Sequence, residues 1–194
     1  DVLKLTSNLR EAKYLIRKSK IMVDGKILKD HRYPVGLMDV ITIPDINKAY
    51  RILPSIHSGL IVSEISNDLA NIKLCRIENK TTVKGGHCQL NLHDGRNIQI
   101  SAKEGKKYKT RGTVKISIPE QKILDYYPLE EGNQAIIKSG NNIGVAGKIT
   151  ELDKRFGVNA SLARIETKDG IISTSYEYVF PIGHKESAID LPME

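Results

Sequence analysis

The sequence predicts an α+β protein that is mostly β and is built from three small units in succession. Three observations support this fold class. One segment near the amino terminus has helical periodicity, residues 50–118 contain short alternating strands, and the last third places short apolar runs between glycines. Proline and glycine also punctuate the chain twice, which predicts units at residues 1–46, 47–124 and 125–194.

The charge of the chain favours a polyanionic partner. Its 194 residues hold 30 Lys and Arg against 23 Asp and Glu, a net charge of +7. Residues 1–45 carry +3, residues 46–134 carry +5 and residues 135–194 carry −1. Nucleic acid is the polyanion that such a protein most often binds, so we expect an RNA-binding surface in the first two thirds.

A helix is expected directly after the polar cluster "TSN". Asn8 offers an N-cap and Glu11 follows three residues later. The apolar residues that recur at helical spacing, and that we expect to be buried, are Leu9, Ala12, Leu15 and Ile16. At 100° per residue a set of cations falls in one arc beside this stripe, namely Arg10, Lys13, Arg17 and Lys20. A solvated helix face would have the same pattern.

A hairpin follows in the stretch "KSKIMVDGKILKDH", where apolar residues alternate on either side of Asp24-Gly25. This dipeptide favours a two-residue turn because both positions tolerate positive φ. The cations that cluster around it are Lys18, Lys20, Lys26, Lys29 and Arg32. The hairpin therefore extends the basic face of the helix.

The centre of the chain is β-rich. Strands are predicted at "GLIVSEI", "IKLCRI", "CQLNL", "NIQI" and "TVKISI", with one helical turn in "NDLAN". Asp94-Gly95 predicts a second hairpin, and we count Arg96 beside it among the candidate RNA ligands.

A basic loop, "KEGKKYKTRGTVK", surrounds Tyr108 with cations, of which Lys106, Lys107 and Lys109 are candidate RNA ligands. An aromatic ring among lysines suits single-stranded or looped RNA, whose bases stack while phosphates meet the cations. A mobile solvated loop is the alternative. The last segment has short strands and tight glycine turns, which fit a small barrel.

Metal and cofactor sites are not expected. Cys75, His87, Cys88 and His93 lack the short pairwise spacing of a zinc site, and two thiols in an intracellular chain stay reduced. No apolar run reaches the roughly 18 residues of a membrane span, and no signal peptide opens the chain, so we expect a soluble intracellular protein. Because the sequence begins at Asp1 without Met, we expect residues to be missing upstream.

The first 43 residues resemble the S4-type RNA-binding domain, on the core "REAKYLIRKSKIMVDGK". In the general pattern Gly-Asp precedes the last strand, whereas here Leu37-Met38 separates Gly36 from Asp39. The form "YPVGLMDVITI" is similar to the archaeal and eukaryotic small-subunit ribosomal proteins of the S-four-e family. The segment "YRILPSIHSGLIVSEI" resembles the central β domain of that family, and "GNQAIIKSGNNIGVAGKITE" resembles the KOW motif of its SH3-like barrel.

The chain is thus identified as a member of that family, with two departures. A basic arm and a fuller first helix are absent before Asp1, and Arg111-Gly112 stands where the family has Gly-Asp. The resemblance implies a non-enzymatic constituent of the cytoplasmic small subunit, with small-subunit rRNA and neighbouring ribosomal proteins as partners. It implies no cofactor, small-molecule substrate or membrane, and a monomer off the ribosome.

Two alternatives stay open from the residues. An RNA-modifying enzyme would need a carboxylate or histidine isolated in a pocket, and the spacing here isolates none. A translation or transcription factor would bind RNA with the first unit and protein with the near-neutral barrel.

Overall fold

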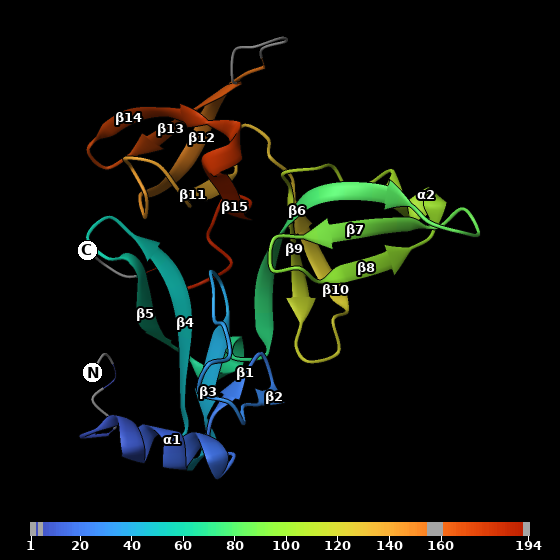
Figure 1. The fold of residues 1–194 in the computed structure, drawn as a ribbon. Coiled ribbons are helices and arrows are strands. Elements are labelled where there is room, and N and C mark those ends of the chain that lie inside the picture. The colour runs from blue at the N-terminus through green and yellow to red at the C-terminus, as the bar shows by residue number, and fades with distance from the viewer. Residues whose placement is uncertain (1–2, 4–5, 155–160, 192–194) are drawn as a thin grey trace.

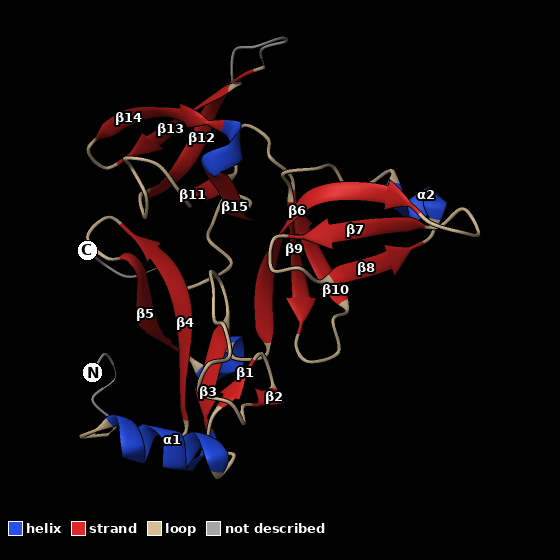
Figure 2. Ribbon diagram, in the orientation of Figure 1, coloured by secondary structure: helices blue, strands red, loops and turns tan. Residues whose placement is uncertain are grey.

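The structure is a computed structural model that describes residue 3, residues 6–154 and residues 161–191. It consists of three antiparallel sheets of five strands each, with two short α-helices (Figures 1 and 2). The mostly β, α+β class predicted from the sequence is confirmed in this coarse form. Residues 155–160 of the predicted barrel lie outside the described residues.

The first sheet has the strand order β2-β1-β3-β4-β5. Its elements are α1 (Leu9–Arg17), β1 (Met22–Val23), β2 (Lys26–Ile27), β3 (Val40–Ile43), β4 (Lys48–Ser55) and β5 (Gly59–Ile65), with 3-10 turns at Pro44–Ile46 and Asn67–Leu69. The hairpin between β1 and β2 turns through Asp24 and Gly25, whose φ values of 49° and 73° confirm the predicted left-handed pair.

The second sheet has the order β10-β9-β6-β7-β8. Its elements are β6 (Ile72–Thr82), β7 (Cys88–Leu92), β8 (Asn97–Ile100), α2 (Ala102–Gly105), β9 (Thr113–Ser117) and β10 (Ile123–Tyr127). The Asp94-Gly95 hairpin joins β7 and β8, but only Gly95 has a positive φ, 84°. The loop is therefore longer than the two-residue turn that this dipeptide predicts, and Asp94 is free to turn inward.

The third sheet has the order β14-β13-β12-β11-β15. Its elements are β11 (Gln134–Ile137), β12 (Ala146–Asp153), β13 (Leu162–Thr167), β14 (Gly170–Ser175), the 3-10 turn η3 (Tyr176–Tyr178) and β15 (Val179–Gly183). The short strands and glycine turns expected for the last segment are present.

The predicted unit boundaries fall inside sheets. The boundary at 46/47 separates β3 from β4, which pair through Thr42 and Ala49, and the boundary at 124/125 cuts β10. Pro54, taken as punctuation, is a residue of β4. It is tolerated because β4 pairs with β3 only as far as Arg51, so that at Pro54 only the β5 side of the strand is paired.

Helix α1 has the predicted N-cap, since the Asn8 side chain accepts from the Glu11 backbone N–H at 3.0 Å. The prediction that its apolar stripe is buried is wrong. None of its residues is buried, and Leu9 is 66% exposed. The helix lies at the lower end of the first sheet in Figure 1, where the two-residue strands β1 and β2 offer little surface to cover it.

One apolar cluster joins the three sheets into a single body. Met38 and Leu53 come from the first sheet and its approach, Leu74 and Tyr127 from the second, and Phe180 from the third. Burial of large apolar side chains provides most of the favourable free energy of folding. The three units therefore share this cluster, beside a second cluster formed by the first and second sheets and a third that lies within the third sheet and its turn η3.

No helix among the described residues is long and apolar enough to cross a membrane.

Candidate nucleic-acid interface

Helix α1 presents cations to solvent. Arg10 and Arg17 are exposed and Lys13 is partly exposed. Lys18 follows as the C-cap, with its Nζ 5.6 Å from the centre of the Tyr14 ring. These side chains make no ion pair among the described residues, so their charges are available to an external anion.

The helical spacing predicted Lys20 on the basic face of the helix, but the structure places it beyond the end of the helix. The helix ends at Arg17, and Ser19 has a left-handed φ of 60°, which redirects the chain. The Nζ of Lys20 lies 2.7 Å from the Asp45 carboxylate, and both side chains are about half exposed. An exposed pair of this kind is worth little, so Lys20 can exchange Asp45 for a phosphate.

The hairpin adds exposed cations next to the helix. Lys26, Lys29 and Arg32 are exposed, and Asp30 accepts a hydrogen bond from the Arg32 backbone N–H at 3.0 Å. We call this region the helix–hairpin surface; its members are Arg10, Lys13, Arg17, Lys18, Lys20, Lys26, Lys29 and Arg32. All eight are sequence-predicted RNA ligands, and the fold brings them to one end of the molecule.

A second basic surface surrounds α2. Ser101 caps the helix in a capping box with Glu104, and Lys80 donates to the carbonyl oxygens of Gly105 and Tyr108 at 2.7 Å each. The segment is thus tied down by hydrogen bonds. We call its exposed cations the α2 surface; they are Lys103, Lys106, Lys107 and Lys109. Lys109 is 70% exposed at its side chain and pairs with Glu130 at 3.0 Å.

Tyr108 is packed more closely than the sequence suggested. Its ring meets the Tyr126 ring edge-to-face, with centroids 5.1 Å apart, and burial raises the pKa of the Tyr108 hydroxyl. The Tyr126 hydroxyl accepts from the Lys109 backbone N–H at 2.8 Å. Tyr108 therefore anchors the α2 surface to the core and does not stand free between lysines.

The two basic surfaces lie at different ends of the molecule. In Figure 1, α1 and the β1–β2 hairpin are at the bottom, whereas α2 is at the far right, at the end of the β7 and β8 strands. This separation could not be predicted from the sequence, because both segments belong to the same basic two thirds of the chain. A partner that meets both must be extended or must approach from two directions.

A buried ionic cluster joins the first and second sheets. The Lys73 side chain is 1% exposed, and its Nζ lies 2.7 Å from Asp24, 2.5 Å from Asp39 and 2.8 Å from Asp94. Burial alone would lower the pKa of Lys73, but the surrounding negative charges raise it well above its usual value. Asp24 is thus a turn residue and also an internal ligand of Lys73.

Arg96 belongs to the same cluster, which corrects its assignment as an RNA ligand. Its side chain is 17% exposed, and its guanidinium pairs with Asp24 and, at 3.1 Å, with Asp94. Two carboxylates already hold it on the inner side of the β7–β8 turn. We therefore leave Arg96 out of the candidate interface.

The split Gly36…Asp39 motif contributes Asp39 to this cluster. The Gly36 backbone N–H donates to Asp39 Oδ2 at 2.8 Å, which leaves Asp39 Oδ1 for Lys73. Met38, between them, has a left-handed φ of 68° and is fully buried. The inserted residues thus make a turn that keeps Gly36 and Asp39 in contact.

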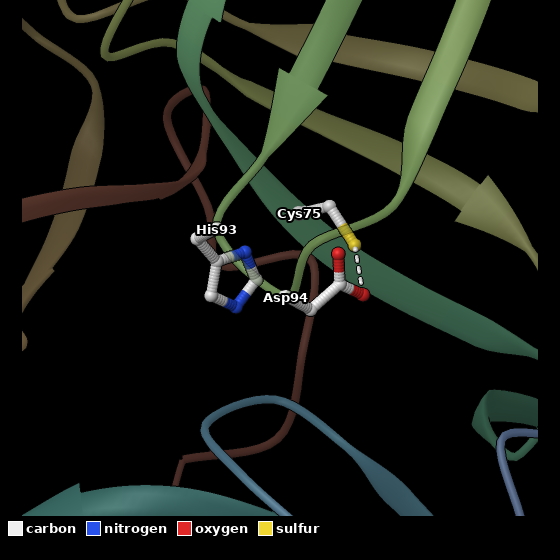
Figure 3. Close-up of side chains that lie close together, drawn as sticks. All are labelled: Cys75, His93 and Asp94. Atoms are coloured by element: carbon white, nitrogen blue, oxygen red, sulfur yellow. Dashed lines mark hydrogen bonds between the residues drawn. The ribbon is translucent and has the colours of Figure 1, made fainter.

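Figure 3 shows three side chains at the edge of the cluster, Cys75, His93 and Asp94, whose potential ligand atoms lie within 4.8 Å of one another. His93 Nδ1 accepts from the Arg76 backbone N–H and Nε2 donates to the Leu37 carbonyl, each at 3.1 Å. The Cys75 thiol donates to Asp94 at 3.6 Å, and burial raises its pKa. Every ligand atom is occupied within the protein, so the group does not favour a metal. Cys88 and His87 lie outside it.

Comparison with known proteins places the chain in a family. A model described as ribosomal family S4e matches residues 46–123. The chain is 49% identical over 99% of its length to the small ribosomal subunit protein eS4 of Staphylothermus marinus, of which the match covers 79%. The chain belongs to the ribosomal family S4e. The S4e protein of Methanocaldococcus jannaschii is 43% identical over 98% of this chain and 80% of its own length.

The fold agrees with a solved S4e structure. The crystal structure of the 30S ribosomal protein S4e from Thermoplasma acidophilum superposes with a TM-score of 0.80 at 30% identity, over 95% of this chain and 92% of that one. Within this S4e chain, sequence reasoning found the helix–hairpin and α2 cations but missed the Lys73 cluster. The one feature of the sequence that could have indicated this cluster is that Lys73 lies on the same side of its strand as Cys75 and Ile77.

Proposed function

We propose that this chain is a structural constituent of the small ribosomal subunit that holds small-subunit rRNA at two places, through the helix–hairpin surface and the α2 surface. The observation that carries the proposal is the family match over nearly the whole chain, combined with two separate groups of exposed cations. Proteins of the S4e family are ribosomal components and the chain is not an enzyme. Its location is the cytoplasmic ribosome.

The mode of binding follows from the residue types. Lysine and arginine side chains that neutralise phosphates release counterions, which supplies affinity without reading base sequence. Specificity then comes from the shape of the folded RNA, which must offer phosphates to two distant surfaces at once. The near-neutral third unit leaves surface for neighbouring ribosomal proteins, and we propose that the free protein is a monomer.

We also propose the domain assignments. Helix α1 with the β1–β2 hairpin and β3 corresponds to an S4-type module, residues 1–46, and the third sheet to an SH3-like KOW barrel within residues 125–194. The supporting features are the Asp24-Gly25 turn in the basic hairpin and the five short antiparallel strands at the carboxyl end. The region 47–124 is then the central β domain.

The test is a matched pair of double variants. Lys13→Ala with Arg17→Ala removes two charges from the helix–hairpin surface, and Lys168→Ala with Lys185→Ala removes two exposed charges from the third unit. Binding to small-subunit rRNA is measured over a salt series. The first variant should weaken binding and reduce the log–log salt slope by roughly 0.7–0.9 per lost contact, whereas the control should not.

The corresponding change in the α2 surface, Lys106→Ala with Lys107→Ala, should have an effect similar to that of the first variant. If both variants bind rRNA with the wild-type salt slope, these cations are ordinary solvated surface and the proposal is wrong. Thermal unfolding of each variant verifies that the fold is retained, because all four side chains are at least partly exposed.

A further inference from the structure

A cavity of about 620 Å³ opens between the second and third sheets. Four segments form it: β6, the loop before β9, the loop after β11, and η3. Its charged and aromatic lining is Arg76, Glu78, Arg111, Lys138, Glu177 and Tyr178, and the hydroxyl residues Thr110 and Ser139 complete it. The volume is within the range of about 300–1,000 Å³ that suits a small ligand or one building block of a polymer.

One wall of the cavity is fixed by Arg76. This buried guanidinium pairs with Glu78 at 2.7 Å and donates to the carbonyl oxygens of Glu177 and Val179 at 2.7 and 2.8 Å. Lys138 pairs with the same Glu78 at 3.1 Å. These contacts join the two sheets and use the charges of Arg76, Lys138 and Glu78 within the wall.

Arg111 is the cation left for a ligand. Its guanidinium lies 3.9 Å from the Glu177 carboxylate, too far for a hydrogen bond, and its side chain is 43% exposed. The three cations and two carboxylates of the lining leave one positive charge in excess. An anion of single charge, such as a phosphodiester, would balance the site.

The backbone at Arg111 is strained, which marks the residue. Its φ is 67°, in the left-handed region where glycine is favoured and a β-carbon is destabilising. The turn is held by hydrogen bonds of 2.7 Å from the Arg111 N–H to the Ile77 carbonyl and 2.8 Å from the Ile77 N–H to the Gly112 carbonyl. These hydrogen bonds fix the backbone at the point where Arg111 lines the cavity.

Tyr178 supplies a flat apolar surface beside that cation. Tyr178 lines the cavity and is nevertheless 39% exposed. The ring packs close to Gly140, where a β-carbon would lie 3.2 Å from two ring carbons, so the glycine leaves room for the ring at this position. An aromatic face next to a cation is the combination that holds a nucleotide in proteins that bind single-stranded nucleic acid.

We propose that this cavity binds one unpaired nucleotide of RNA, with the base stacked on Tyr178 and the phosphate held by Arg111. Thr110 and Ser139 provide hydroxyls for the base edge or the ribose 2′-hydroxyl. The inference rests on the proposed function, because it names a third RNA contact of the same protein. An acidic side chain of a neighbouring protein would use Arg111 but would leave the Tyr178 face without a partner.

The test compares two RNA probes, a fully paired hairpin and the same hairpin with one bulged adenosine. The wild-type chain should bind the bulged probe at least about fivefold more tightly, the lower end of what one stacked base provides. Tyr178→Ala and Arg111→Gly should each abolish this preference while binding the paired probe like the wild type. Tyr178→Phe, which keeps the ring, should retain the preference.

Arg111→Gly also tests the fold, because glycine relieves the left-handed strain and the variant should unfold at the wild-type temperature or above. Equal binding of both probes by the wild type, or a preference that survives both variants, overturns the nucleotide site. The nucleotide site is also overturned if polyglutamate competes with RNA for the wild type and for Tyr178→Ala but not for Arg111→Gly. These results leave the proposed function standing as long as the paired probe still binds with a salt dependence that the helix–hairpin variant reduces.

Discussion

The substitution Lys73→Met should destabilise the protein severely. The lysine is fully buried and its ammonium lies within 2.8 Å of three carboxylates, Asp24, Asp39 and Asp94. Methionine fills a similar volume, so the change removes the charge and leaves little cavity. Removing one partner from a buried ionic group typically costs about 3–5 kcal/mol. Arg96 still pairs with Asp24 and Asp94 in the variant, whereas Asp39 loses the one cation that it contacts among the described residues.

A loss of this size is a large share of the stability of a typical domain, about 5–15 kcal/mol. Urea unfolding followed by circular dichroism measures it. The matched control is Lys48→Met, which breaks the ion pair with Glu64 on the surface, where the side chains are 45% and 56% exposed. The control should unfold at almost the same urea concentration as the wild type, because exposed ion pairs contribute little to stability.

The difference between Lys73→Met and the wild type should also depend on pH. In the wild type, burial opposes ionisation of Asp94, but Lys73 lowers its pKa below 3.8, so this contribution to stability is lost only as the pH falls below that value. Without Lys73, burial of Asp94 is no longer offset by the charge that lowers its pKa most, so the deficit of the variant should narrow as the pH falls. A variant that loses less than about 1 kcal/mol, or whose deficit is the same at pH 7 and pH 4, would refute this account.

Two further predictions concern the neighbouring side chains. Burial lowers the pKa of His93 below its usual 6.5, so its neutral form stabilises the fold above that pH, and this contribution is lost as the pH falls from 6.5 through the lowered pKa. The variant His93→Gln should therefore show an unfolding free energy that changes less with pH over this range. A pH profile identical to that of the wild type would contradict the assignment. Treatment with EDTA should leave the unfolding midpoint unchanged, because the atoms of Cys75, His93 and Asp94 are occupied by protein partners; a stoichiometric metal in protein purified without added metal would disprove this.

Local patterns in the sequence predicted local structure well. The strands "GLIVSEI", "CQLNL" and "NIQI" coincide with β5, β7 and β8, because alternation of apolar residues and turn residues acts over a few positions. The Asn8 cap and the Asp24-Gly25 turn were also predictable, since each depends on one or two side chains. The exposed cations followed from charge alone.

Contacts between distant residues could not be predicted in this way. Lys73 meets Asp24 and Asp39 from 49 and 34 positions away, and nothing in the spacing of the aspartates indicates that they converge. Both Asp24 and Asp94 were interpreted as turn residues, which they are, but their carboxylates point inward. The same ambiguity led to Arg96 being taken as an RNA ligand, because a cation next to a turn gives no sign of which side it faces.

The predicted boundaries between units fall within sheets for a related reason. Proline and glycine indicate where a chain turns, but a sheet can continue across a turn, as β3 and β4 do across Pro44. A truncation after residue 124 would cut β10 and remove Ile136, Phe180 and Ile182 from the cluster shared by the three sheets. Such a fragment would lose RNA binding through misfolding, so substitutions of exposed cations are the better measure of each unit's contribution.

The shared apolar cluster and the Lys73 cluster also hold the two basic surfaces at a fixed separation. The Lys73 cluster fixes the β1–β2 hairpin to the second sheet, and that sheet carries the α2 surface at its far end (Figure 1). Two sites on one rigid body engage RNA with a high effective concentration, because binding at one places the other, provided that their separation matches the RNA. On the proposed function, the buried ions would therefore contribute to RNA affinity without touching RNA. If this argument is correct, Lys73→Met studied at a temperature where it remains folded should bind short hairpins like the wild type but should lose affinity for intact small-subunit rRNA, which alone can reach both surfaces.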